Sequence, residues 1–392
     1  MLKTFFGRQP HREKPVHVCH LLLRLGYGGM ENGVVNIVNH TDRRLFRHTI
    51  VCLEDDNPLA DRLATDVKLH SLGGGSSGHC ARYAKTFRVL REIRPDIVHT
   101  RNLPTIDLFP IAKAAGNPEL VHSEHGLDML ERGGSPLKYR AIRRLGGLFT
   151  RRYVALSSDI ATWMAEEQGI PSHKIQRILN GVDTARFVPA DADNRDAVRR
   201  ALCGESDGCL LIGSLGRLEV IKDHENLAYA YVDMVRRCPR LQDETRLCLG
   251  GDGSRREAID NIMREAGLAE NLVMTGYISD PLTFYQALDV FVLPSKSEGT
   301  SNTVLEAMSC GLAVVATDVG ENRHLIDDGS TGRIVPSETP QRLADALSHY
   351  VQHPDVIEQH AWNARQKACR AFSLDTMIAS YSALYRSLFS EM

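Results

Sequence analysis

The sequence predicts an α/β protein with two domains, each built on a doubly wound parallel sheet of the Rossmann type. Short apolar runs rich in β-branched residues alternate with longer stretches of helical period, as in sheets whose parallel strands are joined by helices. A polar stretch over 191–207 interrupts this alternation, and a second series of strands follows it. The length of 392 residues also exceeds what one core usually organises, at about 150 residues per domain.

The first domain is expected to span 1–185. The apolar segment 16–23 predicts a buried strand, the glycines within 26–29 predict a turn, and 30–39 is expected to be helical. The other elements expected in this domain are a helix over 82–93 and strands at 49–53, 97–99, 120–122 and 153–156.

The second domain is expected to span 186–371. A final helix is expected over 372–392, where apolar residues recur at helical spacing. Two such sheets in tandem are expected to face each other across a cleft at the carboxyl ends of their strands, where ligands bind in open α/β sheets. The strands predicted in this domain are 209–215, 245–249, 272–275, 290–293 and 313–317.

The composition is that of an ordinary globular protein, with 43% hydrophobic residues, 24% charged residues and a net charge of −2. We therefore expect no nucleic-acid partner. The nine cysteines are scattered without a C-x-x-C pair, which indicates reduced thiols in a cytoplasmic protein. The chain has no apolar run of signal-peptide or membrane-span length, so we expect neither export nor a membrane span.

The glycines after the first predicted strand indicate a phosphate site rather than a dinucleotide site. The segment GYGGME starts a G-x-G-x-x-G pattern at Gly26 and Gly28, but Glu31 stands where the third glycine is needed. A glycine turn at the start of a helix still offers free backbone N–H groups, which can hold a phosphate. Gly28 and Gly29 are therefore candidates for substrate binding, and a tight turn without a ligand is an equally good interpretation.

Two cations follow the first predicted strand of the second domain. Arg217 and Lys222 lie in SLGRLEVIKDHENL, where both can reach the same cleft. Two fixed cations suit a diphosphate, because they would neutralise the charge that develops on a leaving nucleoside diphosphate. Solvated surface charges are the alternative interpretation, and the position at a strand end favours the phosphate site.

A pair of glutamates, Glu298 and Glu306, lies between a predicted strand end and a helix in SEGTSNTVLEAMSCG. The helix is expected to begin near Ser301 or Asn302, with Glu306 one turn inside it. Small residues before the helix, Gly299 and Thr300, let a ligand approach the N–H groups of the first turn. Glu306 can then accept hydrogen bonds from ribose hydroxyls while Glu298 reaches the sugar ring. Such a spacing also occurs by chance, so the position in the fold carries this interpretation.

His125, in HSEHGLD, follows a predicted strand of the first domain at the edge where the cleft opens. It is a candidate hydrogen-bonding partner of the donor sugar, and a structural histidine is the alternative. No group of residues has metal-ligand spacing, and the acidic run 54–56 is interpreted as a solvated turn. We therefore expect no metal site.

The motifs as a set resemble glycosyltransferase family 4, whose members have the GT-B fold of two Rossmann-like domains. They are GGME, SEHG, NGVDTARF, GRL followed by Lys222, GGDG, and the two glutamates followed by AMSCGLAVVATDVGENRHLI. The resemblance covers nearly the whole chain and is more specific in the second half. It also implies that NGVD at 180–183 is an interdomain hinge and that the last helix crosses back to the first domain.

The resemblance implies a retaining, metal-independent hexosyltransferase that uses a nucleotide-diphosphate sugar and no cofactor. It implies that Arg217 and Lys222 bind the diphosphate, Glu306 the ribose and Glu298 the sugar, and that His125 touches the donor sugar. In the mechanism it implies, the leaving phosphate accepts the acceptor's proton, and the protein supplies positioning and electrostatics. The residues expected to bind substrate are Gly28, Gly29, Arg217, Lys222, Gly299, Thr300, Asn302, Thr303 and Glu306, with Glu298 and His125 as the catalytic pair.

Within the family the chain is most similar to sugar transferases of bacterial exopolysaccharide clusters associated with exosortase systems. This similarity implies a saccharide or lipid-linked acceptor. One departure from the family pattern is ENRH at 321–324, where many relatives have Gly-Asn-Pro-Glu. We expect this change to lie outside the site.

The segment 137–152 suggests peripheral contact with the anionic inner face of the cytoplasmic membrane. Apolar side chains recur there at helical spacing among Lys and Arg residues. A basic solvated face is the alternative, because Gly146 and Gly147 interrupt the helix. The residues concerned are Tyr139, Ile142, Leu145 and Leu148, and Lys138, Arg140, Arg143, Arg144, Arg151 and Arg152.

Two other functions are compatible with a two-domain fold of this kind. A nucleotide-sugar epimerase would need acid and base groups in the cleft but no acceptor site, and it would turn over its donor alone. A non-catalytic protein that binds nucleotide sugars would show the same donor chemistry before and after Glu298→Ala.

Overall fold

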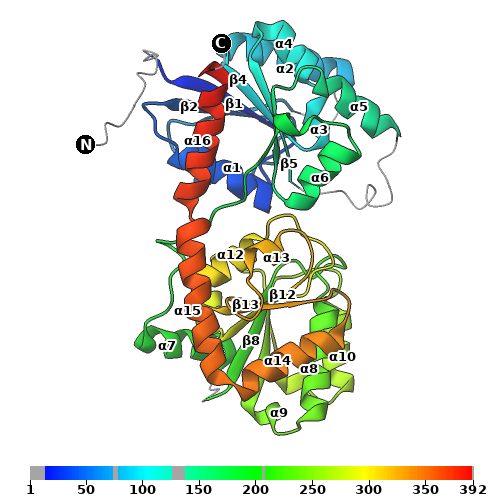
Figure 1. The fold of residues 1–392 in the computed structure, drawn as a ribbon, viewed down its shortest axis with the longest axis vertical. Coiled ribbons are helices and arrows are strands. Elements are labelled where there is room, and N and C mark those ends of the chain that lie inside the picture. The colour runs from blue at the N-terminus through cyan, green and yellow to red at the C-terminus, as the bar shows by residue number, and fades with distance from the viewer. Residues whose placement is uncertain (1–13, 74–77, 126–136, 205–207, 391–392) are drawn as a thin grey trace, which may run out of the picture. The chain divides into compact units, whose positions relative to one another are not determined.

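The computed structural model describes residues 14–73, 78–125, 137–204 and 208–390. The chain divides into two compact units (Figure 1). Unit 1 comprises 1–154, 164–176 and 380–392, and unit 2 comprises 155–163 and 177–379. Residues 177–185 therefore group with unit 2, although the sequence-based boundary stood at 186.

Unit 1 is built on a seven-stranded sheet with the strand order β3-β2-β1-β4-β5-β6-β7. The neighbours from β3 to β5 pair in parallel. The order reverses between β1 and β4, which makes their carboxyl ends the switch point where such sheets bind ligands. The strands are β1 (Val16–Leu22), β2 (Phe46–Cys52), β3 (Lys68–Ser71), β4 (Ile97–Arg101), β5 (Glu119–Glu124), β6 (Arg152–Ala155) and β7 (Ile175–Arg177).

Helices flank this sheet on both faces, and α16 (Leu374–Ser390) lies against it with its last residues (Figure 1). Tyr385 of α16 is fully buried, and its hydroxyl lies 2.9 Å from Nδ1 of His99 on β4. The other helices of unit 1 are α1 (Gly29–His40), α2 (His79–Ile93), α3 (Leu103–Ile106), α4 (Phe109–Gly116) and α5 (Leu137–Gly147), with 3-10 turns η1 (Ala60–Arg62) and η3 (Ser172–Lys174). Helix α6 (Ser158–Glu166) is divided, and its residues up to Trp163 group with unit 2.

Unit 2 is built on a six-stranded parallel sheet with the order β10-β9-β8-β11-β12-β13. Its order reverses between β8 and β11. Buried aliphatic side chains cover both faces, as the near-continuous apolar strands predict. The strands are β8 (Leu210–Leu215), β9 (Thr245–Gly250), β10 (Leu272–Gly276), β11 (Val290–Leu293), β12 (Ala313–Thr317) and β13 (Gly332–Val335).

The helices of unit 2 fill the connections between these strands, and α14 and α15 follow the last strand. They are α7 (Ala192–Cys203), α8 (His224–Arg237), α9 (Leu241–Glu244), α10 (Arg256–Glu265), α11 (Leu282–Ala287), α12 (Asn302–Ser309), α13 (Asn322–Leu325), α14 (Pro340–Gln352) and α15 (Pro354–Ala371), with the 3-10 turn η4 (Ala269–Asn271).

The described part of the polar stretch, 191–204, has no strand, as predicted, and most of it forms helix α7. Asp191 caps the helix by accepting a hydrogen bond from the Asn194 N–H at 2.8 Å. Arg195 and Arg199 then bind Asp289 at 2.5 and 2.9 Å. The polar composition that interrupted the apolar pattern thus belongs to a surface helix held by ion pairs.

Candidate functional site

The predicted site residues form two sets, one in each unit. Gly28, Gly29 and His125 belong to unit 1, and all others belong to unit 2. Both sets lie at carboxyl ends of sheet strands, where open α/β sheets bind ligands.

Lys222 and Glu298 meet at the switch point of unit 2. The loop after β8 carries Lys222 and the loop after β11 carries Glu298, and Nζ lies 2.6 Å from Oε1. Ser295 donates its hydroxyl to the same oxygen at 2.6 Å. Both side chains are largely buried, at 23% and 10% exposure. Lys222, which was predicted to bind phosphate, and Glu298, which was predicted to bind the sugar, therefore form a direct ion pair. Arg217 lies exposed in the same loop as Lys222.

The loop that carries Glu298 is fixed by its neighbours. Helix α12 begins at Asn302, as predicted, and Ser301 caps it by accepting a hydrogen bond from the Val304 N–H. The Thr300 hydroxyl donates to the carbonyl of Leu156, and the Glu321 N–H donates to the carbonyl of Gly299 at 3.1 Å. These contacts hold the loop in one conformation beside the first turn of α12.

The ENRH segment at 321–324 therefore contacts the site loop, and the expectation that it lies outside the site was wrong. A Cβ atom on Gly320 would lie 2.3 Å from the Glu298 carbonyl oxygen, so the two loops pack backbone against backbone. The buried carboxylate of Glu321 also accepts a hydrogen bond from the N–H of Ser158, at the start of α6. The sequence could not reveal the contact between the 321–324 segment and the loop of Glu298, because these two loops meet only through the pairing of β11 with β12.

Glu306 lies on α12, one turn inside the helix as predicted. Its Oε2 accepts a hydrogen bond from the hydroxyl of Tyr285 at 2.7 Å. Burial, and then the Glu306 carboxylate, raise the pKa of Tyr285 well above its ordinary value, so the hydroxyl stays a donor. Tyr285 was missed by sequence reasoning, because only the packing of α11 on the sheet brings it to this carboxylate.

The remaining predicted residues of α12 lie at its first turn. The Asn302 side-chain oxygen accepts a hydrogen bond from the amide of Asn180 at 2.9 Å, and the hydroxyls of Thr303 and Ser301 are 3.1 Å apart. Asn180 belongs to the segment NGVD that the family resemblance marks as a hinge. The first turn of α12 is thus tied to that segment within unit 2.

In unit 1, the predicted turn and helix after β1 are present. Gly28 precedes α1 in an extended conformation, and the helix begins at Gly29. A Cβ atom on Gly28 would lie 2.3 Å from a carboxylate oxygen of Glu31, so only glycine leaves this side chain undisturbed. At the start of α1, Gly29 is exposed and the Glu31 carboxylate lies beside Gly28.

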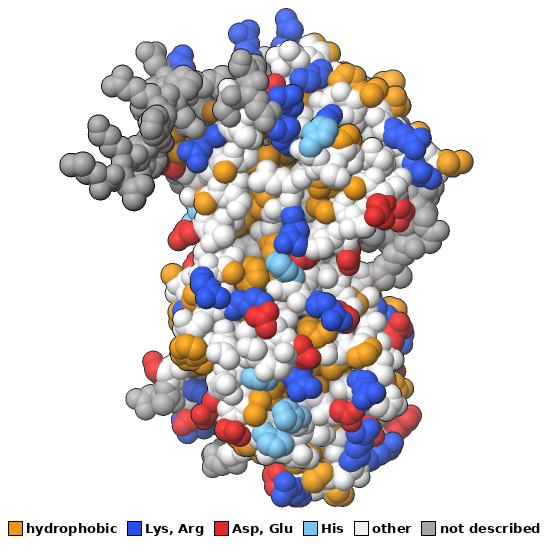
Figure 2. Space-filling model, in the orientation of Figure 1, with side chains coloured by type: hydrophobic (Ala, Val, Ile, Leu, Met, Phe, Trp, Pro, Cys, Tyr) orange, Lys and Arg blue, Asp and Glu red, His pale blue; other side chains and the backbone are white. Residues whose placement is uncertain are grey.

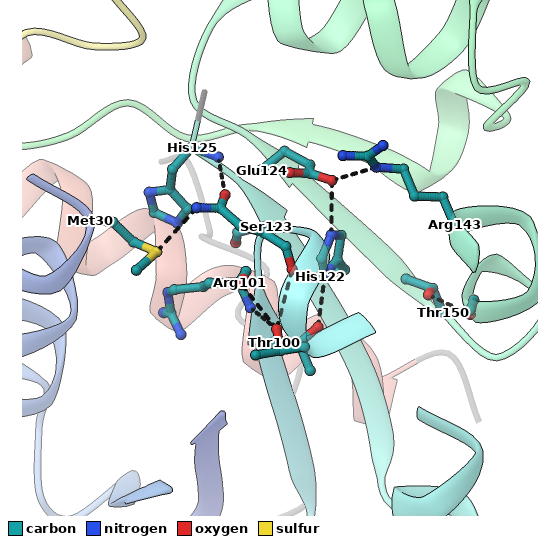
Figure 3. A network of polar contacts seen from close by, with 12 residues as sticks. Met30, Thr100, Arg101, His122, Ser123, Glu124, His125, Arg143 and Thr150 are labelled. Carbon is teal, nitrogen blue, oxygen red and sulfur yellow. Dashed lines mark hydrogen bonds and ion pairs between the residues drawn. The ribbon is translucent and has the colours of Figure 1, made fainter. Parts of the chain in front are cut away.

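His125 follows β5 directly and is half-buried (Figure 3). Both ring nitrogens are buried, and neither has a hydrogen-bond partner among the described residues. Burial, and then the charges of Arg101 and His122, hold its pKa well below the ordinary value. The neutral ring has one donor and one acceptor nitrogen to offer a ligand.

A polar network connects the strand ends around His125 (Figure 3). The His125 N–H donates to Oδ1 of Asn102 at 2.9 Å, and Nδ2 of Asn102 lies 3.5 Å from the sulfur of Met30. Asn102 was not predicted as a site residue. The sequence could have indicated Asn102 as a site residue, because it follows predicted strand β4 just as His125 follows β5.

One of the cations predicted for the basic face of helix α5, Arg143, does not lie on that face. Arg143 is buried, and its Nε donates to the buried carboxylate of Glu124 at 2.9 Å. Glu124 also lies 3.2 Å from Nε2 of His122, and the pKa of its carboxyl is lowered by that histidine and by Arg143 against the effect of burial. Arg143 therefore attaches α5 to the sheet and does not face outward.

The rest of α5 and the turn after it expose apolar side chains, with Leu137 at 82%, Leu145 at 61% and Leu148 at 76% exposure. Exposed Lys138 and Arg144 accompany them. Figure 2 shows basic and hydrophobic side chains next to one another at the edge of unit 1 where Figure 1 places α5.

Within the described ranges, no group of three or more His, Cys, Asp or Glu side chains is arranged to hold a metal ion. In the same part of the chain, no helix has the length and apolarity needed to cross a bilayer.

Two family models match the chain. Glycosyltransferase Family 4 matches residues 27–186, and Glycosyl transferases group 1 matches residues 209–353. A GDP-mannose-dependent alpha-mannosyltransferase of Mycobacterium tuberculosis is 30% identical over 342 residues, which cover 82% of this chain and 84% of that protein. The chain belongs to glycosyltransferase family 4. It is thus a glycosyltransferase, as the motifs predicted.

Other glycosyltransferases match it over varying lengths. A D-inositol 3-phosphate glycosyltransferase of Corynebacterium urealyticum is 31% identical, over 57% of this chain but only 54% of that protein. An Escherichia coli UDP-Gal:alpha-D-GlcNAc-diphosphoundecaprenol alpha-1,3-galactosyltransferase is 26% identical, over 76% of this chain and 77% of that protein. The mannosyl- and galactosyltransferases among these relatives support hexosyl transfer, and none of those named is an epimerase.

The fold is also that of solved glycosyltransferases. The structure of Anabaena Alr3699/HepE in complex with UDP has a TM-score of 0.82 at 20% identity, covering 95% of this chain and all of that one. The structure of WaaG, a glycosyltransferase involved in lipopolysaccharide biosynthesis, has a TM-score of 0.73 at 16% identity, and the match covers 94% of this chain and 99% of WaaG. The two parallel sheets with flanking helices confirm the predicted GT-B class.

Proposed function

We propose that this family 4 enzyme transfers a hexose from a nucleotide-diphosphate sugar to a saccharide or lipid-linked acceptor, with retention of configuration and without a bound metal. The observation that carries this proposal is the pair formed by Lys222 and Glu298 at the switch point of unit 2. It sets a fixed cation beside a carboxylate, at the edge of the sheet where a ligand is expected.

In the proposed reaction, the diphosphate lies along Lys222, Arg217 and the first turn of α12. Lys222 and Arg217 neutralise the charge that develops as the bond between the sugar and the diphosphate breaks. The acceptor oxygen attacks the same face of the sugar, and its proton passes to the departing phosphate oxygen. Retention then needs no protein nucleophile, and the residues act by position and charge.

The carboxylates orient the donor in this proposal. Glu306 accepts hydrogen bonds from the ribose hydroxyls, and the Tyr285 hydroxyl on its Oε2 keeps that carboxylate in place. Glu298 faces the sugar while Lys222 and Ser295 hold one of its oxygens. In unit 1, the backbone at Gly28 and Gly29 contributes N–H groups, and neutral His125 hydrogen-bonds a sugar hydroxyl.

The donor class is supported by relatives whose names specify GDP-mannose and UDP-galactose, and by a structural neighbour bound to UDP. In a thermal-shift panel, one of GDP-mannose, UDP-glucose and ADP-glucose is expected to raise the melting temperature of the chain, since a ligand that binds only the folded state stabilises it. A panel without any shift would contradict a nucleotide-sugar donor.

Metal independence has its own test. Turnover of the donor that the panel selects is expected to be the same with excess EDTA as with added Mg²⁺ or Mn²⁺, because Lys222 and Arg217 supply the charge that a metal would supply. Turnover that needs either ion would overturn this part of the proposal.

For the acceptor, we propose a lipid-linked saccharide of cell-surface or exopolysaccharide synthesis, reached from the cytoplasmic side of the membrane. The exposed leucines and cations of α5 suit a surface of anionic lipids. The E. coli relative is named for a diphosphoundecaprenol substrate.

If α5 contacts the membrane, Lys138→Ala combined with Arg144→Ala should lower affinity for phosphatidylglycerol vesicles about tenfold or more. The reason is that each cation near an anionic surface contributes about 1 kcal/mol to the binding free energy. Vesicle co-sedimentation measures it. A control is Arg240→Ala combined with Arg264→Ala in unit 2, where both side chains are similarly exposed. Equal binding by wild type and the α5 variant would leave α5 as a solvated basic face.

A further inference from the structure

We propose that Asn102 is a positioning residue for glycosyl transfer, which sets the backbone of His125 against the first turn of α1. The inference rests on the proposed contact between His125 and the donor sugar. It concerns a residue that neither the motifs nor the family resemblance singled out.

Asn102 has an unusual backbone conformation, with φ 57° and ψ 169°. Other non-glycine residues with positive φ, such as Arg94, Asn117 and Asp223, lie in the left-handed helical region, with ψ of 65°, 43° and 41°. The region that Asn102 occupies is close to one that only glycine adopts readily. A residue with a side chain is under strain there, and glycine would not be.

The surrounding structure holds this conformation from both sides. The Asn102 N–H donates to the carbonyl of Ser123 on β5 at 2.8 Å. The hydroxyl of Thr105 accepts from the Arg101 N–H at 3.0 Å and donates to the Arg101 carbonyl at 2.9 Å. Arg101 is itself anchored, with Nη1 3.0 Å from Nδ1 of His20 on β1. The strain is thus enforced by contacts to β5, α3 and β1.

The strained backbone aims the side chain of Asn102 between two candidate site segments. Its Oδ1 accepts the hydrogen bond from the His125 N–H at 2.9 Å, and its Nδ2 faces the sulfur of Met30 at 3.5 Å. Figure 3 marks these contacts with dashed lines that start at His125 and Met30. Met30 follows Gly29 at the start of α1. One amide side chain therefore joins the ends of β4 and β5 to α1, beside the switch point of the sheet.

Two substitutions at position 102 can distinguish the contacts of the side chain from the strain in the backbone. Glycine at 102 removes the strain together with the link to His125 and Met30. Alanine removes the link and keeps the strain. A side chain that matters only for folding would make both changes visible in stability, whereas a positioning side chain makes both visible in the handling of the sugar.

The test compares Asn102→Gly and Asn102→Ala with wild type, using GDP-mannose and GDP, UDP-glucose and UDP, or ADP-glucose and ADP, whichever pair binds wild type. Melting temperature, the Kd of nucleotide and nucleotide sugar, and kcat and KM for donor turnover are measured. Asn117→Gly and Asn117→Ala are the matched controls, since Asn117 also has positive φ but caps α4 away from these contacts.

We expect Asn102→Gly to melt no lower than Asn102→Ala. Both are expected to bind the nucleotide sugar and turn it over about tenfold less well, because a misplaced group near the chemistry costs rate. Both should bind the free nucleoside diphosphate as wild type does, since its proposed contacts lie mainly in unit 2. The Asn117 variants should differ from wild type in melting temperature only.

Wild-type turnover and nucleotide-sugar affinity in Asn102→Gly would overturn the inference, as would an equal loss of nucleotide and nucleotide-sugar binding. His125→Ala distinguishes this failure from failure of the proposed function. If His125→Ala is impaired while Asn102→Gly is not, only the positioning role is wrong. If His125→Ala is unimpaired, the proposed contact of His125 with the sugar is wrong as well.

Discussion

Lys222→Ala is expected to lower the rate of glycosyl transfer about 100-fold or more, the loss typical of deleting one contact to a developing charge. In the proposed reaction the ammonium neutralises the departing diphosphate. Its Nζ is held 2.6 Å from Oε1 of Glu298, so it is preorganised and needs little rearrangement as the charge forms. Activity assays with the donor selected by thermal shift measure the effect.

The Lys222→Ala loss is expected to fall mainly on kcat. The contact strengthens as the sugar–phosphate bond breaks, so the transition state gains more from it than the bound donor does. A change confined to KM would instead mean that Lys222 binds ground state and transition state equally. That result would contradict the proposed role.

A matched control is Lys367→Ala, which removes another lysine of unit 2 paired with a carboxylate. Lys367 lies 2.9 Å from Asp327, and its side chain is 15% exposed, comparable with the 23% of Lys222. Loss of a partly exposed ion pair lowers stability by about 1 kcal/mol or less. Lys367→Ala should therefore keep the wild-type rate, and a similar rate loss in both variants would point to folding rather than chemistry.

The positions of the unit 2 site residues could largely be predicted from the sequence, because they depend on local rules. A helix that starts after a strand, with small residues before it, predicts where Glu298 and Glu306 lie. The sequence did not predict that Glu298 would pair with Lys222. That contact exists because β8 and β11 are neighbours in the sheet, although the two residues are 76 positions apart.

The misses have the same physical origin. Arg143 has the sequence context of a solvated cation, and only the docking of α5 on β5 gives it the buried partner Glu124. Glu321 contacts the site loop because Gly320 allows two backbones to approach closely. Asn102 adopts a conformation that its own residue type disfavours, so its neighbours determine it and propensity does not.

Mild acid is expected to destabilise unit 1, because three buried histidines and half-buried His125 lie near one buried cation. His20, His99 and His125 have pKa values well below the ordinary value, and burial lowers the pKa of His48 to about 3. Burial is the largest cause in each case. Arg101, which is 2% exposed, adds repulsion toward all four.

The direction of the effect follows from proton binding. Below an unfolded pKa of about 6.5, the unfolded chain binds protons at these histidines and the folded chain does not. The free energy of unfolding therefore falls as pH drops below about 6.5, and it is constant with respect to these groups above that value. At about pH 5.5, a histidine with a folded pKa of about 3, as for His48, accounts for roughly 1.4 kcal/mol, and the lowered pKa values of the other three act in the same direction.

A typical domain has only about 5 to 15 kcal/mol of stability, so a loss in this direction matters to unit 1. Hydrogen exchange at about pH 7.5 and 5.5, corrected for intrinsic rates, should show loss of protection in β1, β2 and β4 before the strands of unit 2. The network explains why these strands respond together, since His48 contacts His20 at 2.9 Å and His20 contacts Arg101 at 3.0 Å.

A variant can separate these histidines from general acid sensitivity. His48→Gln keeps a polar side chain but cannot take up a proton, so it should lower the pH dependence of the unfolding free energy by about 1.4 kcal/mol per pH unit near pH 5. His40→Gln is the control, because His40 is exposed at the end of α1. Equal slopes in wild type and His48→Gln would mean that acid acts elsewhere, whereas a reduced slope would identify the buried histidines as the groups that make unit 1 sensitive to acid.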